Sequence, residues 1–164
     1  MDAVSEVFSD PNLSAGRQLL LQSGYGQELG GLMLAVVRAC ELGEQAQEAV
    51  ILTMARRLRH EYAWQEHVPR ALQAGVTRED ITAIGRDELD RLPDDIRSPC
   101  EYTRSVLADV KLPETWPDNP GQRSPDPFAA LVGTILTIFA MHKSADLQPQ
   151  GTFVGWGLES SVGD

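Results

Sequence analysis

The apolar residues of this chain recur with the period of an α-helix rather than that of a strand. Leucines at 19–21 predict a short first helix, and the largely apolar residues 27–40 predict a second. Residues 44–58 begin with acids and amides and end with arginines, an order that the dipole of a third helix favours. Residues 60–74 carry apolar side chains every three or four positions, which predicts a fourth. We expect glycines to close the second and fourth helices, at Gly43 and Gly75.

Capping signals mark two further helices. Thr77 and Asp80 form an approximate capping box, which predicts a short helix that Gly85 ends. Ser98 is followed by Pro99, a residue that suits the first position of a helix, so another helix is expected from there to about residue 110.

The last part of the chain combines a proline-rich segment with a strongly apolar one. Five prolines between Pro113 and Pro127 predict a loop. Residues 128–146 then predict a helix that is apolar all round, which requires burial in the core or in a subunit interface. Residues 147–164 form a glycine-rich tail, either a poorly ordered extension or an arm that docks Phe153 and Trp156 on a neighbour. The pattern predicts an all-α bundle of about six to seven helices, in a single domain over 1–164.

Composition and charge narrow the class of protein. The apolar fraction of 42% and the charged fraction of 23% are typical of a globular chain. A net charge of -10 disfavours nucleic acid as a partner. Cys40 and Cys100 form no CxxC motif, which favours a reducing cytoplasm. The longest apolar run is shorter than the roughly 20 residues of a membrane span, so no membrane association is expected.

Two residues stand out as candidates for proton transfer. Glu48 precedes the apolar run 49–55, so its carboxylate is expected to be part-buried. His67 shares an apolar stripe with Trp64, where an imidazole needs a hydrogen-bond partner, and Glu48 is a candidate for that partner. One unbroken helix would hold the two residues about 28 Å apart, so the pairing requires a break between Ala55 and Glu61. The local sequence has neither glycine nor proline there, so it does not by itself predict this break.

Residues 60–84 resemble the central signature of the carboxymuconolactone decarboxylase family, within the alkyl hydroperoxidase D-like superfamily. The resemblance rests on Tyr62-x-Trp64-x-x-His67, followed by Ala74-Gly75-Val76 and an acidic short helix. In the peroxidase branch a glutamate is followed by eleven residues, a CxxC, three residues and a histidine. Glu48 and His67 match the glutamate and the histidine, whereas His60 and Ala63 replace the cysteines, so thiol chemistry is not expected.

The resemblance implies an alkyl hydroperoxidase D-like fold, a homo-oligomer (trimer or hexamer) and a lyase without a cofactor. Such an enzyme would decarboxylate a small carboxylated or oxygenated molecule, or catalyse a related proton transfer, with His67 as general acid and Glu48 orienting it. The substrate-binding candidates are His60, Tyr62, Trp64 and Arg56. Thiol-independent peroxide chemistry and a non-catalytic binding or assembly protein are the alternatives.

Several of these residues also have structural interpretations. His60 either lines the site or serves the start of its helix. The arginines Arg56, Arg57, Arg59 and Arg70 either hold a carboxylate or are solvated and ion-paired. A metal bound by His60 and His67, completed by His142, is a weaker alternative because the first two lie two turns apart. Cys100 is either a reactive thiol near a helix start or a structural residue.

Overall fold

A computed structural model describes residues 15–108, 127–149, 153, 155 and 156, and all regular structure within these residues is helical. The helices are α2 (Ala15–Gln22), α3 (Gly26–Cys40), α4 (Glu44–Arg57), α5 (Glu61–Gln73), α6 (Arg78–Arg86), the 3-10 turn η1 (Leu89–Arg91), α7 (Asp94–Ala108) and α8 (Pro127–Ser144). The all-α prediction is confirmed. The predicted loop over 113–127 lies almost wholly outside the described residues.

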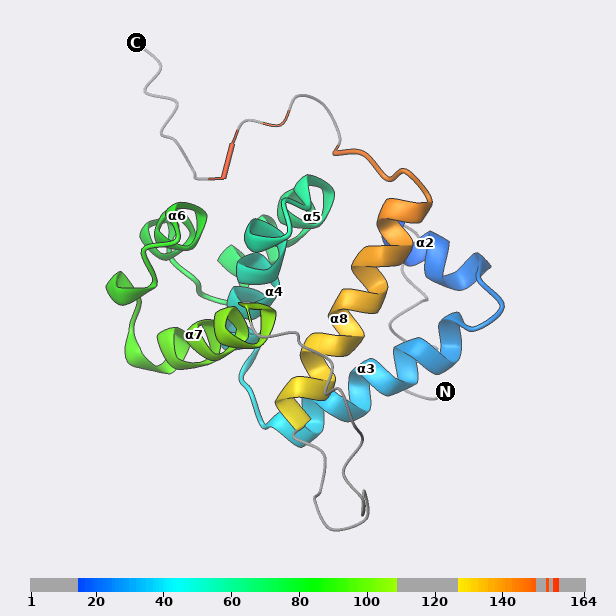
Figure 1. The fold of residues 1–164 in the computed structure, drawn as a ribbon, viewed down its shortest axis with the longest axis horizontal. Coiled ribbons are helices and arrows are strands. Elements are labelled where there is room, and N and C mark those ends of the chain that lie inside the picture. The colour runs from blue at the N-terminus through cyan, green and yellow to red at the C-terminus, as the bar shows by residue number, and fades with distance from the viewer. Residues whose placement is uncertain (1–14, 109–126, 150–152, 154, 157–164) are drawn as a thin grey trace.

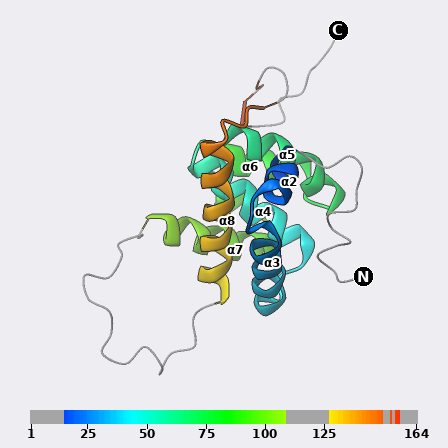
Figure 2. The same cartoon turned by 90° about the vertical axis from the view of Figure 1, so that its right-hand side faces the viewer.

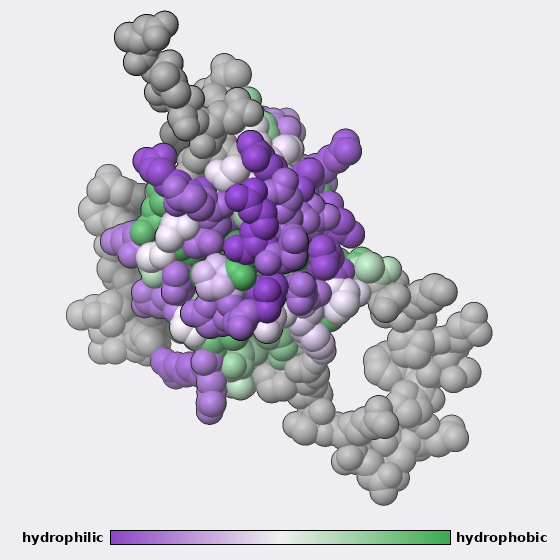
Figure 3. All heavy atoms as spheres, turned by 90° about the vertical axis from the view of Figure 1, so that its left-hand side faces the viewer, coloured by the Kyte–Doolittle hydropathy of each residue, from purple (hydrophilic) through white to green (hydrophobic). Residues whose placement is uncertain are grey.

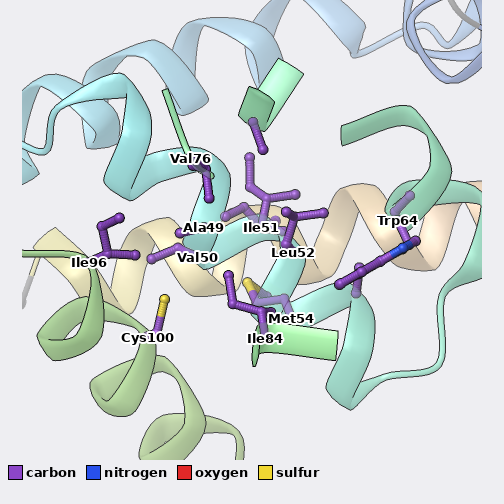
Figure 4. Close-up of a cluster of buried hydrophobic side chains, with 14 of the residues drawn as sticks. Ala49, Val50, Ile51, Leu52, Met54, Trp64, Val76, Ile84, Ile96 and Cys100 are labelled. Carbon is purple, nitrogen blue, oxygen red and sulfur yellow. The ribbon is translucent and has the colours of Figure 1, made fainter. Parts of the chain in front are cut away.

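Helix α4 is the centre of the fold. It packs against α5, α6 and α7, while α8 packs mainly against α3 (Figure 1). Every residue from Ala49 to Ala55 is buried, including the polar Thr53, whose hydroxyl donates to the Ala49 carbonyl at 2.8 Å. Figure 4 shows this run surrounded by side chains from neighbouring helices. A helix with no polar stretch in its middle is stable here because other helices cover it on most sides.

The C-terminal ends of two helices differ from the prediction. Glu41, in the left-handed conformation at φ 52, closes α3, and Gly43 instead precedes α4. Helix α6 continues through Gly85 to Arg86, and Asp87 at φ 62 follows it. Each glycine was expected to supply the left-handed turn, but an acidic residue supplies it instead. The capping box of Thr77 and Asp80 is confirmed.

Helix α7 begins earlier than Ser98. It starts at Asp94, and Pro99 lies inside it. The acids Asp94 and Asp95 occupy its first turn, where the helix dipole favours negative charge, and the Pro93 carbonyl accepts from the Ile96 amide at 3.1 Å. The expected start at Ser98 was therefore wrong.

Helix α8 is apolar all round but is not buried all round. Its inner side carries Leu131, Val132, Ile135 and Phe139, each at most 4% exposed. Its exposed positions are mostly small residues, at Ala129, Gly133, Thr137 and Ala140. None of the described helices combines the length and the apolar character that a bilayer crossing requires.

The two sides of the molecule differ in polarity. The face at the left of Figure 1, where α6 and α7 lie, is mostly hydrophilic (Figure 3). Most of the large exposed apolar side chains lie on α2, on α3 and between them, with Leu21 at 44%, Tyr25 at 55% and Leu32 at 50%, while Tyr102 at 43% lies on α7.

Candidate active site

The turn between α4 and α5 brings the two proposed catalytic residues together. Helix α4 ends at Arg57 and α5 starts at Glu61, which confirms the predicted break between Ala55 and Glu61. Arg59 adopts φ 51, a left-handed conformation that is uncommon for a residue with a side chain, and the His60 amide donates to the Ala55 carbonyl at 2.8 Å. The chain reverses here, so residues 19 positions apart meet across the helix pair.

Glu48 and His67 form a hydrogen-bonded pair. His67 Nδ1 lies 2.8 Å from Glu48 Oε2, and each side chain is 18% exposed. Because a carboxylate can only accept, the proton of this bond is on Nδ1. The second ring nitrogen, Nε2, is thereby left to give or take a proton. An imidazole oriented in this way by a carboxylate is a common arrangement for general acid–base catalysis.

His67 borders a cavity of about 200 Å³ between α2, α3, α5 and α8, with one residue from α4. Figure 2 views the side of the molecule where these helices lie together. The apolar lining residues are Leu20, Met33, Leu34, Ile51, Ala63, Ile135, Ile138 and Phe139, with Gly16 and Gly30. The polar lining residues are Arg17, Tyr62, Glu66, His67, Arg70 and His142. A mostly apolar cavity with a few polar groups is typical of a small-molecule site.

Arg70 is the cationic group of α5 at this cavity. It lies 3.8 Å from Glu66 in a weak ion pair one helical turn away, and its side chain is 33% exposed. Because this contact is long and the side chain is partly exposed, the guanidinium is a candidate group for binding a carboxylate. The sequence grouped Arg70 with three other arginines without distinguishing it.

Tyr62 lines the cavity, as expected of a substrate-binding candidate. It is 4% exposed, and its hydroxyl accepts a hydrogen bond from the Gly16 amide at 2.6 Å. This bond fixes the start of α2 against α5. Close packing requires a glycine at position 16, because a Cβ there would lie 2.7 Å from His142 Nε2 and 3.1 Å from the Tyr62 hydroxyl oxygen.

His60 has the structural role rather than the ligand-binding one. It is 3% exposed and does not line the cavity. Its Nδ1 accepts from the Ala63 amide at 3.4 Å, capping α5, and its Nε2 donates to the Phe139 carbonyl at 3.2 Å. Burial lowers the pKa of this imidazole, which keeps it neutral. Both nitrogens are therefore occupied, and none is left for a substrate or a metal.

Arg56 and Trp64 lie away from the cavity. Arg56 Nε donates to the Gly85 carbonyl at 2.6 Å, and its guanidinium lies 5.3 Å from the ring centre of Trp156. Trp64 packs edge to face with the same Trp156 at 5.6 Å. The tail residue Trp156 thus docks on its own chain, and it covers the two residues that were expected to bind substrate.

Other candidate chemistry is not supported by the geometry. Among the described residues, no group of three His, Cys, Asp or Glu side chains could hold a metal ion. Burial raises the pKa of the Cys100 thiol to about 11, so this cysteine is a neutral core residue. Arg57 pairs with Asp87 at 3.2 Å.

His142 is the residue of this site that sequence reasoning missed in its present role. It lies in the last turn of α8, 75 positions after His67, and the apolar pattern of that helix gives no signal for a cavity-lining imidazole.

Comparison of the chain with protein-family models, with curated proteins and with solved structures found no significant match.

Proposed function

We propose that this chain is an enzyme resembling the carboxymuconolactone decarboxylases, which removes carbon dioxide from a small carboxylated molecule, or catalyses a related proton transfer, without a cofactor. The observation that carries the proposal is the 2.8 Å contact between Glu48 and His67 beside a mostly apolar cavity. The match of Tyr62, Trp64 and His67 to the signature of that family supports the choice of reaction.

In the proposed reaction the bond between the substrate carbon and its carboxylate breaks, and carbon dioxide leaves without the electron pair. The pair stays on the carbon as a carbanion or enolate. The imidazolium of His67 donates the Nε2 proton to that carbon and becomes neutral, and water later restores the proton. The Glu48 carboxylate holds the Nδ1 proton throughout and stabilises the imidazolium.

Arg70 is the residue proposed to bind a second carboxylate or the developing enolate oxygen. It replaces Arg56 in this role because it lines the cavity, whereas Arg56 is bonded to Gly85 on α6. The apolar lining would favour the reaction, since a carboxylate that leaves as neutral carbon dioxide is less stable in apolar surroundings than in water.

The test measures release of carbon dioxide from a carboxymuconolactone, the compound class after which the family is named, and from simple β-keto acids. In D2O, one deuterium should enter the product at the carbon that lost the carboxylate. His67→Ala should abolish turnover, whereas Glu61→Gln, on the exposed first turn of the same helix, should retain it. Equal turnover in the two variants would refute the assignment. Peroxide consumption without added thiol would favour the peroxide alternative instead.

A non-catalytic binding protein is the second candidate, because the lining of the cavity is mostly apolar. It predicts that a ligand binds equally well to the wild type and to His67→Ala, with no turnover by either.

We also propose a cytoplasmic homo-oligomer. The exposed apolar side chains of Leu21, Tyr25 and Leu32 support an interface on the α2–α3 side. Light scattering at micromolar concentration should give a mass of three or six chains, and a monomer would contradict the proposal.

A further inference from the structure

His142 is a buried imidazole without a hydrogen bond. It is 7% exposed, and neither ring nitrogen has a hydrogen-bond partner among the described residues. The other two histidines of the described chain differ, since both nitrogens of His60 and Nδ1 of His67 are bonded. Buried polar groups are nearly always hydrogen-bonded in native proteins, so an unpaired one beside a cavity is a candidate binding group.

Packing holds the His142 ring in place. Tyr62 meets it edge to face with ring centres 5.2 Å apart, and His60 does so at 5.6 Å. On the third side, α2 approaches so closely that only a glycine fits at position 16. The ring is therefore positioned by its neighbours, and it borders the cavity with both of its nitrogens buried and unpaired.

The charge of His142 restricts what it can bind. Burial, and then the nearby histidines His60 and His67, lower its pKa to about 4, so the ring is neutral at pH 7. A neutral imidazole has one donor nitrogen and one acceptor nitrogen. It suits a neutral hydroxyl or carbonyl group, whereas a carboxylate is better matched by Arg70.

The size of the cavity restricts the ligand further. A volume of about 200 Å³ is below the roughly 300 Å³ of the smallest usual sites for drug-sized ligands. An apolar cavity of about 150 Å³ is large enough for benzene. The space therefore suits one six-membered or five-membered ring with small substituents.

We propose that His142 is a ligand-binding residue, whose neutral imidazole hydrogen-bonds a hydroxyl or carbonyl oxygen on a single-ring, mostly apolar molecule. The identification of that molecule as the carboxylated substrate of His67 rests on the proposed function. The binding role of His142 does not, because it follows from the unpaired nitrogens and the cavity.

The test compares phenol with toluene, which replaces the hydroxyl by a methyl group of similar size. Calorimetry at pH 7.5 measures both dissociation constants for the wild type, His142→Leu, His142→Gln and His67→Leu. The wild type should bind phenol about tenfold more tightly than toluene. His142→Leu should lose this preference, and His142→Gln should keep part of it because an amide also donates and accepts. His67→Leu, which removes the other imidazole of the cavity, should keep the preference.

The proposal is overturned if neither compound binds, if the wild type shows no preference, or if the preference survives in His142→Leu. If His142→Leu does not fold, nitrogen NMR of the histidine-labelled wild type decides: phenol, but not toluene, should shift the ring nitrogens of His142. Unshifted His142 nitrogens would overturn the proposal.

Neither probe carries a carboxylate, so this result is independent of turnover. Repeating the comparison with 4-hydroxybenzoate and 4-methylbenzoate tests the substrate class. If the wild type releases no carbon dioxide from the test substrates but still prefers phenol to toluene, the proposed function is refuted. The binding role of His142 is then still supported.

Discussion

Replacing His142 by leucine should make the protein more stable, although the residue lies in a tightly packed region. Leucine has a similar volume, a better helix propensity and no polar atom to leave unpaired. Removing a buried unpaired polar group is worth about 1–3 kcal/mol. The lost ring contacts with Tyr62 and His60 offset about 0.5–1.5 kcal/mol of this. The net gain expected at pH 7 is about 1 kcal/mol.

Acid should enlarge this gain, because the wild-type imidazole resists protonation. Its pKa falls from 6.5 to about 4 in the folded protein, mainly through burial. The folded value lies below the unfolded one, so the unfolded chain takes up a proton first as the pH falls from about 6.5. Linkage then removes about 2 kcal/mol of wild-type stability between pH 7 and pH 5. The leucine variant has no such group, so its advantage should grow to about 3 kcal/mol.

Urea unfolding measures both quantities, with tryptophan fluorescence, to which the buried Trp64 contributes, as the signal. Wild type and variant are compared at pH 7 and pH 5 at low micromolar concentration. The other ionisable groups are common to both proteins, so the difference between the two proteins reports mainly on His142. A stability difference that is the same at both pH values would refute the shifted titration. A variant less stable than the wild type by about 2 kcal/mol at pH 7 would show that the imidazole is hydrogen-bonded in the native state.

Three further substitutions test the site and its surroundings. Glu48→Gln should keep the fold but lower the turnover rate by at least about 100-fold, because the amide no longer stabilises the imidazolium. The control Glu44→Gln, on the exposed start of α4, should have no effect. Equal turnover rates in the two variants would contradict the proposed role of the pair. Gly16→Ala should destabilise the protein by roughly 1–3 kcal/mol in urea unfolding, since its Cβ would lie 2.7 Å from His142 Nε2. Trp156→Ala should make the chain around residues 153–156 more susceptible to limited proteolysis, because it removes the contacts with Trp64 and Arg56. It should leave turnover unchanged because these contacts lie outside the cavity, and a loss of turnover would argue against this cavity as the site.

The sequence predicted the helices of this fold well, because amphipathic periodicity is a local property. It predicted the break before α5 only through the resemblance. The structure gives the reason: a non-glycine residue, Arg59, takes the left-handed conformation, and a histidine ring caps the helix. Neither has a sequence signal comparable to glycine or to a serine cap. The start of α7 was misplaced because Pro99 suggests a first position but is tolerated inside the helix.

The candidate site was predicted in part. Glu48 and His67 come from adjacent helices, so a motif with fixed spacing is enough to find them. Trp64 and Arg56 lie close to them in the sequence, yet they point toward the side covered by Trp156. His142 and Gly16 lie on helices that are distant in the sequence from α4 and α5, and only tertiary packing brings them to the cavity.

The hydrogen bond from His60 to the Phe139 carbonyl joins residues 79 positions apart. Contacts at such separation form after local ones, because a long stretch of chain must first be ordered. The α4–α5 hairpin that holds Glu48 and His67 can thus assemble early, whereas the cavity is completed only when α8 docks. Substitutions in α8 would therefore change the lining of the cavity during evolution and leave the contact between Glu48 and His67 intact.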